Sequence, residues 1–161
     1  MMRPVTIFTG QWADLSFKDV CQKMSELKYD GLEIACWGDH MEVNKAAQDP
    51  DYTANKKSIL AKYDLQCWAL GAHLAGQCVG DCYDERLDVF APDKVKGKPD
   101  ELREWAIEEM KSTPQAAKNM GCKVVTCFMG SPIWKYWYSF PPTSDEIIEK
   151  GYAKIKKLWS P

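Results

Sequence analysis

Four repeats of one pattern constrain the fold of this chain more than any other feature of its sequence. In each repeat, a short apolar run is followed by a loop and then by a stretch whose apolar residues recur every three or four positions. The short runs suit strands that are covered on both faces, and the longer stretches are typical of amphipathic helices. Strands that alternate with helices predict right-handed crossovers and an α/β fold with a parallel sheet. The predicted strands are residues 5–9, 32–37, 65–70 and 123–129.

The predicted helices follow these strands and begin near residues 16, 52, 99 and 144. Serines with acidic residues behind them indicate the starts of the first and the last helix. Pro114 is expected to kink or restart the third helix, because proline cannot donate a backbone hydrogen bond. Residues 72–98 are predicted to form a long loop, and loops of this length are often functional. The last helix is expected to bury one stripe, formed by Ile147, Ile148, Tyr152, Ile155, Leu158 and Trp159.

Charge, apolar segments and cysteine content exclude several classes of protein. The net charge is −2, so no surface for nucleic acid or anionic lipid is predicted. No run approaches the roughly 18 apolar residues of a membrane span, and the first residues do not resemble a secretory signal. The seven cysteines are an odd number, and several fall in predicted strands and helices, which predicts free thiols in a reducing cytoplasm. Glycine-rich phosphate motifs and the G-x-S-x-G motif are absent from the sequence.

Three segments match one known family in their order and spacing. They are residues 29–34 (YDGLEI), 71–77 (GAHLAGQ) and 116–125 (AAKNMGCKVV), and the first is followed by WGDH at residues 37–40. Together they resemble the second, third and fourth strands of the xylose-isomerase-like TIM barrels, which include sugar phosphate isomerases and epimerases. The resemblance implies a (β/α)₄ segment, the N-terminal half of a TIM barrel, with parallel strands in the order 1-2-3-4. It further implies a single half-barrel domain over residues 1–161.

The length of the chain bears on the activity that this resemblance implies. A TIM barrel needs roughly 250 residues, whereas this sequence has 161 and stops where the family would enter its fifth strand. The resemblance also implies a divalent metal (Mn, Mg, Co or Zn), held mainly by Glu, Asp and His residues of strands five to eight. Those positions have no counterpart in this sequence. We therefore expect no tightly bound metal and no isomerisation of sugars by this chain alone.

Candidate site residues follow the predicted strands, because TIM-barrel active sites lie at the carboxyl ends of the strands. Glu33 interrupts an apolar strand, where a carboxylate is costly unless paired, so it is either a site residue or the partner of a positive group. The resemblance favours His73 over His40 for contact with a ligand, and for both the alternative is a loop histidine that is merely hydrogen-bonded. No catalytic residue or metal ligand is assigned. The residues predicted to bind a sugar or sugar phosphate are Glu33, Trp37, His40, His73 and Gln77.

Two further groups of residues have side chains that could bind a ligand. His73, Cys78 and Cys82 could converge on zinc, but a structural zinc site needs four ligands, so no such site is predicted. The aromatic residues of segment 134–140 could stack on a sugar ring or shield an apolar interface, and both alternatives stay open.

Three functions are compatible with the sequence. The first is the N-terminal half of a metal-dependent sugar isomerase or epimerase, which supplies substrate-pocket residues and is inactive alone. The second is a noncatalytic half-barrel that self-associates, since the first and fourth strands would be sheet edges and Ile7, Ile34 and Val125 could lie on an uncovered interior face. A homo-oligomer that closes an eight-stranded barrel is expected in that case. The third is a complete flavodoxin-like domain that binds a small ligand and has the strand order 2-1-3-4.

Overall fold

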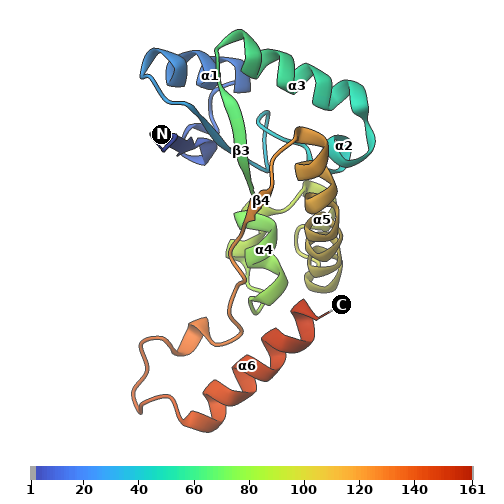
Figure 1. Ribbon diagram of the computed structural model, residues 1–161. Coiled ribbons are helices and arrows are strands. Elements are labelled where there is room, and N and C mark those ends of the chain that lie inside the picture. The colour runs from blue at the N-terminus through green and yellow to red at the C-terminus, as the bar shows by residue number, and fades with distance from the viewer. Residues whose placement is uncertain (1–2, 161) are drawn as a thin grey trace. The chain divides into compact units, whose positions relative to one another are not determined.

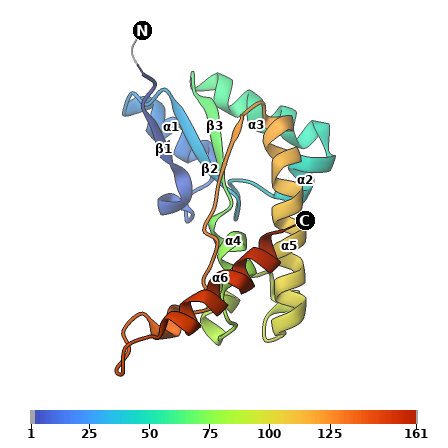
Figure 2. The same ribbon diagram turned by 60° about the horizontal axis from the view of Figure 1, so that its bottom comes forward.

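The strands of the protein form one parallel sheet in the order of the sequence. The structure, a computed structural model, describes residues 3–160. The sheet has the order β1-β2-β3-β4, and every pair of neighbours is parallel (Figure 1 and Figure 2). This order confirms the predicted partial TIM barrel, and it is not the 2-1-3-4 order of a flavodoxin-like domain. The strands are β1 (Thr6–Phe8), β2 (Gly31–Ala35), β3 (Gln66–Gly71) and β4 (Val124–Thr126).

Helices follow the strands as predicted, but residues 43–48 and 73–80 form helices where loops were expected. The helices are α1 (Phe17–Glu26), α2 (Val43–Gln48), α3 (Pro50–Lys62), α4 (His73–Gly80), α5 (Pro99–Met120) and α6 (Asp145–Trp159). Short 3₁₀ turns lie at Thr9–Trp12, Glu85–Phe90, Asp93–Val95 and Trp134–Tyr136. Among residues 3–160, no helix is both long enough and apolar enough to cross a membrane.

The chain divides into two compact units. The first, here called the sheet unit, comprises the residues up to 73 and residues 109–126. The second, here called the helical unit, comprises residues 74–108 and the residues from 127 onward. The four strands and helices α1, α2 and α3 belong to the sheet unit, whereas α4 after its first residue and α6 belong to the helical unit. Helix α5 contributes its first ten residues to the helical unit and the rest to the sheet unit.

One face of the sheet carries the core of the sheet unit. Leu32, Ile34 and Leu70 are fully buried among residues of α1, α3 and the second half of α5. Figure 2 shows these helices beside the strands. The apolar spacing of α1 places Phe17 and Met24 in this core, and both are almost completely buried. Because alternate residues of a strand point to opposite faces, the residues between them face away from these helices.

The opposite face of the sheet, here called the open face, has a different composition from the one expected. Phe8, Glu33, Ala69 and Val124 are paired across the four strands and form one row on this face. The sequence had suggested that Ile7, Ile34 and Val125 could lie there. The register places these three on the helix-covered face instead, with Ile34 fully buried and the other two packed against the core.

A bulge in β3 adds an aromatic side chain to the open face. Leu32 pairs with Cys67, but the next residue of β2, Glu33, pairs with Ala69, so Trp68 is an extra residue. A bulge of this kind redirects a side chain. The Trp68 ring lies against Gly31, where an added Cβ would collide with it, and 41% of the Trp68 surface is exposed.

Segment 72–98 was predicted to be a loop, and this prediction is wrong over α4. The helix contains two glycines, which lower helix propensity and conceal it in the sequence. Those glycines allow a close approach: a Cβ on Gly76 would meet the carbonyl oxygen of Phe128, and one on Gly80 would meet that of Met129. Packing against residues 128–130 within the helical unit therefore accounts for a helix that local propensity does not predict.

Two expectations for the later helices also need correction. Pro114 does not restart a helix, because α5 is continuous from Pro99 to Met120. Ala116 and Ala117, which follow the proline, are buried in the sheet-unit core and hold this half of the helix in place. Ser144 caps α6 as predicted, through the backbone N–H of Ile147. The predicted stripe of α6 is only partly buried, and 69% of the Tyr152 surface is exposed.

Candidate functional site

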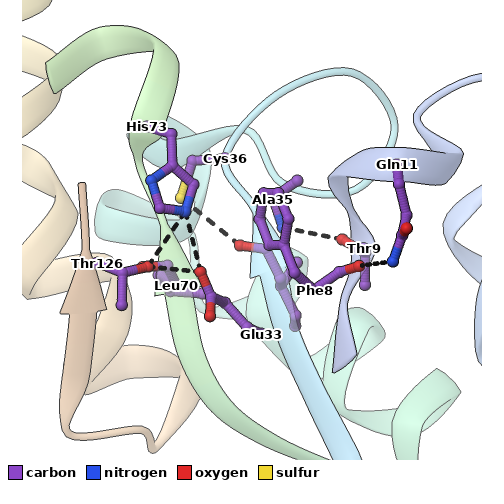
Figure 3. A network of polar contacts seen from close by, with 10 residues as sticks. Phe8, Thr9, Gln11, Glu33, Ala35, Cys36, Leu70, His73 and Thr126 are labelled. Atoms are coloured by element: carbon purple, nitrogen blue, oxygen red, sulfur yellow. Dashed lines mark hydrogen bonds and ion pairs between the residues drawn. The ribbon is translucent and has the colours of Figure 1, made fainter. Parts of the chain in front are cut away.

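Three polar side chains meet at the carboxyl ends of β2, β3 and β4 in the sheet unit. We call Glu33, His73 and Thr126 the strand-end cluster (Figure 3). His73 Nε2 lies 3.0 Å from Glu33 Oε1, and the hydroxyl of Thr126 donates to the same oxygen at 2.6 Å. The Thr126 hydroxyl is also 3.5 Å from His73 Nε2. The three groups thus form a closed polar triangle on the open face.

The register of the sheet brings these residues together. Thr126 pairs with Gly71, which pairs with the end of β2, two residues after Glu33. His73 opens α4 directly after β3. Gly71 lies at the centre of the cluster, and a Cβ there would lie 2.6 Å from the Phe8 ring, 3.0 Å from Glu33 Oε1 and 3.2 Å from the His73 ring. A residue without a side chain is therefore required at position 71.

An aromatic wall borders the strand-end cluster. The Phe8 ring packs edge-on against His73, with 5.0 Å between centroids and 89° between planes. Trp37 lies on Phe8 at 5.6 Å and 70°. Gly10 permits this packing, because a Cβ on it would collide with both aromatic rings. The result is a polar cluster beside an apolar surface, a combination that suits ligands with hydroxyl groups and a flat C–H face.

The Glu33–His73 pair is accessible and suited to proton transfer. The side chains are 25% and 17% exposed, so the pair is shielded but not sealed from solvent. Because an ionised carboxylate only accepts hydrogen bonds, His73 Nε2 carries the proton when Glu33 is charged. A carboxylate that holds an imidazole fixes the orientation of the ring. Both partners of Glu33 among residues 3–160 bind Oε1, which leaves Oε2 to accept a hydroxyl from a ligand.

His40, predicted as a site residue, lies in the core and not in the strand-end cluster. It is completely buried, with Nδ1 2.9 Å from the Thr9 hydroxyl and Nε2 3.2 Å from the Leu15 carbonyl oxygen. The carbonyl can only accept, so Nε2 donates and Nδ1 accepts from Thr9, whose oxygen accepts the N–H of Ala35. Burial lowers the pKa of His40, and the charge of Lys56 lowers it further. Both ring nitrogens of His40 are thus engaged in hydrogen bonds within the core.

Gln77, the fifth predicted site residue, belongs to the helical unit and lines a cavity there. Its amide donates to Asp81 Oδ2 at 2.5 Å, and the backbone N–H of Ser131 donates to the other oxygen of the same carboxylate. Arg103 donates to the Asp81 carbonyl oxygen at 2.9 Å. The cavity measures about 780 Å³, and its wall includes three aromatic side chains of the segment 134–140: Trp134, Trp137 and Tyr138.

The donors of the strand-end cluster do not by themselves suit a divalent metal. A protein site that holds such a divalent metal needs three or four protein ligands. Within residues 3–160, no three His, Cys, Asp or Glu side chains converge on a point that could hold an ion. The cluster offers one carboxylate and one imidazole, and these bind each other. We therefore assign no step of chemistry to a metal held by this chain.

Three residues of the site were not predicted from the sequence. Phe8, Gly71 and Thr126 shape the cluster; Phe8 and Thr126 lie in apolar runs without a distinguishing motif, whereas Gly71 begins the segment GAHLAGQ, in which only His73 and Gln77 were predicted as site residues. Aligning the ends of the predicted strands would not have found Thr126, because the predicted fourth strand extends to residue 129 whereas β4 ends at Thr126. The structure thus brings Glu33, Trp37 and His73 together, places His40 in the core and places Gln77 in the helical unit.

Comparison with known proteins adds one finding. A family model for the xylose isomerase-like TIM barrel matches residues 21–159, which is most of the chain. No curated protein matches the chain in sequence.

Proposed function

Because this chain belongs to the xylose isomerase-like TIM barrel family, we propose that its strand-end cluster binds a sugar or sugar phosphate in an isomerase- or epimerase-type pocket. The observation that carries the proposal is the hydrogen-bonded triangle of Glu33, His73 and Thr126 on the open face of the sheet. TIM barrels place their active sites at this end of the strands. The face that these side chains occupy corresponds to the interior of such a barrel.

Each part of the site has a task in this proposal. Glu33 Oε2 accepts a hydrogen bond from a sugar hydroxyl, while Oε1 holds the imidazole of His73 in place. The rings of Phe8 and Trp37 provide an apolar surface for the C–H face of the sugar. Isomerisation and epimerisation move a proton on a carbon next to a carbonyl, and a positioned histidine can give or take such a proton near neutral pH.

The chain alone is proposed to bind divalent metal weakly and to have no measurable isomerase activity. The support for this proposal is the donor set: one carboxylate and one imidazole fall short of the three or four ligands that hold such an ion. Titration with Mn²⁺ should therefore give a dissociation constant no tighter than that of isolated carboxylate–imidazole pairs. Tight binding together with turnover of a ketose would contradict this proposal.

Nuclear magnetic resonance titration with D-xylose and D-fructose 6-phosphate tests the sugar-binding proposal. We expect ligand-dependent shifts for the amides around residues 8, 33, 37, 73 and 126. Glu33→Gln removes the charge but keeps the shape, and it should weaken binding about tenfold, as expected for losing a charge-assisted hydrogen bond. The matched control is Glu26→Gln, an exposed carboxylate at the end of α1 that should leave binding unchanged. Equal binding by both variants, or shifts confined to other surfaces, would refute the site.

A noncatalytic, self-associating half-barrel is the second candidate function. The open face favours it, because Trp68 and Val124 expose 41% and 49% of their surface there. Strands β1 and β4 are the outer strands of the sheet, and such edges invite pairing with another chain. A twofold dimer would cover this face and both edges at once.

A further inference from the structure

Two cysteines of the sheet unit lie in equivalent positions on neighbouring segments of the chain. Cys67 is the second residue of β3, and Cys122 lies two residues before the start of β4. Each precedes by two residues one member of the cross-strand pair Ala69–Val124. The Cys67 sulfur lies 3.7 Å from the Ala69 carbonyl oxygen, and the Cys122 sulfur lies 3.9 Å from the Val124 carbonyl oxygen. Cys122 belongs to the core of the sheet unit and Cys67 packs against it, so both thiols lie at this core.

The usual spacing of neighbouring strands is compatible with a disulfide between two aligned cysteines. Neighbouring strands lie about 4.8 Å apart, and the Cα atoms of a disulfide are usually about 4.4–6.8 Å apart. We propose that Cys67 and Cys122 form a redox-active pair that closes to a disulfide when the protein meets a peroxide. Nothing in this proposal depends on the sugar site, because neither cysteine belongs to the strand-end cluster.

The thiols of this pair differ in reactivity from other cysteines of the chain. Burial raises the pKa of Cys21 and of Cys78 to about 12, so these thiols stay protonated and inert. The hydrogen bond from the Cys67 thiol lowers the pKa of Cys122, and the same contact, with burial, raises the pKa of Cys67. Cys122 is therefore the more acidic thiol of the pair, and Cys67 is the donor that supports its thiolate.

Accessibility restricts the oxidant to a small molecule. Cys122 is 8% exposed, and Cys67 is half-buried at the start of β3. Hydrogen peroxide is small enough to reach a sulfur with this exposure, whereas a bulky disulfide such as oxidised glutathione is not. The pair is therefore expected to respond to peroxide and not to thiol–disulfide exchange with large partners.

The reaction proceeds in two balanced steps. The Cys122 thiolate attacks one oxygen of the peroxide, so that an S–O bond forms, the O–O bond breaks and hydroxide leaves to become water. The Cys67 sulfur then attacks the sulfur of the resulting sulfenic acid, which forms the S–S bond and releases a second water with the thiol proton. Two electrons pass from the two sulfurs to the peroxide, which is reduced to two molecules of water.

Cys36 is a competing thiol of the sheet unit, and the strand geometry disfavours it as a partner. Its backbone N–H donates to the carbonyl oxygen of Gly71, at the carboxyl end of β3. Cys67 lies four residues earlier, at the amino end of the same strand. Cys122 is aligned with the amino end, so its neighbour in the sheet is Cys67.

Peptide mapping of the peroxide-treated, full-length chain tests the proposal. Trypsin releases Cys122 in the peptide 119–123, which contains no other cysteine, and Cys67 in the peptide 63–86. Chymotryptic cleavage after Trp68 then separates Cys67 from Cys78 and Cys82. We expect a cross-linked product that joins residues 67 and 122, is two hydrogens lighter than the sum of its peptides, and disappears with dithiothreitol. Replacing Cys67 by serine should abolish it, whereas Cys36→Ser should leave it unchanged.

Thermal unfolding gives a second readout that needs no variant. A disulfide that spans residues 67 and 122 restricts the unfolded chain, so the oxidised protein should melt about 5–10 °C above the reduced protein. Dithiothreitol should reverse this shift. The proposal is overturned if Cys122 instead becomes sulfinic acid, stays a free thiol, or pairs with Cys36.

Discussion

Whether each of the two histidines lies at the site or in the core depends on a few neighbouring residues and not on its position along the chain. Both follow a strand, and the sequence places both at the predicted site. His73 follows Gly71, whose missing side chain leaves room for Glu33 and Phe8 beside the imidazole. His40 instead meets the Thr9 hydroxyl and the Leu15 carbonyl oxygen, which enclose its ring completely. Sequence spacing does not distinguish these cases, because the deciding partners are about 25–40 residues away along the chain.

The burial of His40 predicts that stability falls in mild acid. Its folded pKa is lowered below the ordinary value of 6.5, so the unfolded chain binds a proton more readily than the folded one. The contribution of His40 is therefore complete above pH 6.5 and is lost as the pH falls through the window below it. His40 alone can change the free energy of unfolding by at most about 1.4 kcal/mol per pH unit.

Thermal melting between pH 5 and pH 8 measures this effect. His40→Gln keeps a donor for the Leu15 carbonyl but does not titrate, so its melting temperature should depend less steeply on pH than that of the original protein. His73 remains in both proteins and contributes equally to each. If the two curves run parallel, another group is responsible for the acid sensitivity.

At the scale of the element, the periodic pattern predicts most strands and helices, but it misses a helix and a β-bulge that depend on distant contacts. All four strands and the capped starts of α1 and α6 were expected, because apolar spacing and serine caps are local features. The helix α4 was not, because Gly76 and Gly80 reduce local helix propensity and only the packing of residues 128–130 explains them. The bulge at Trp68 likewise depends on pairing with β2, which one strand alone does not encode.

The cap of α1 offers a direct test of local encoding. The Ser16 hydroxyl accepts from the backbone N–H of Asp19 and donates to its carboxylate at 2.7 Å. Ser16→Ala should lower the free energy of unfolding by about 1 kcal/mol, because one backbone donor at the helix start loses its partner. Urea denaturation measures the change. Ser58→Ala, in the exposed middle of α3, is the matched control and should cost less; equal losses would show that the cap does not stabilise α1.

At the scale of the molecule, the sequence predicts the topology but not which residues occupy each face of the sheet. A shift of register by one residue exchanges the two faces, so apolar composition alone cannot assign them. This explains why Ile7, Ile34 and Val125 were only candidates for the uncovered face, whereas the structure packs them against the helices. The observed register also places Glu33 on the open face, where it belongs to the strand-end cluster. The strand order was therefore predictable from the sequence, whereas the residues of the uncovered face were not.

The observed register determines which residue should control self-association. Val124, not Val125, lies on the open face, and it exposes 49% of its surface next to the outer edge of the sheet. We expect light scattering to give a dimer of about twice the 18.4 kDa chain mass. Val124→Lys should dissociate it, because a desolvated, unpaired ammonium group is costly in an interface. Val125→Lys is unsuitable, since a charge in the half-buried core would unfold the protein and also abolish assembly. Val89→Lys, at a 74% exposed valine of the helical unit, is the control that should remain dimeric. A clean monomer without binding of the dye ANS would show that the open face needs no partner, and it would remove the support for a half-barrel that assembles with its own copy.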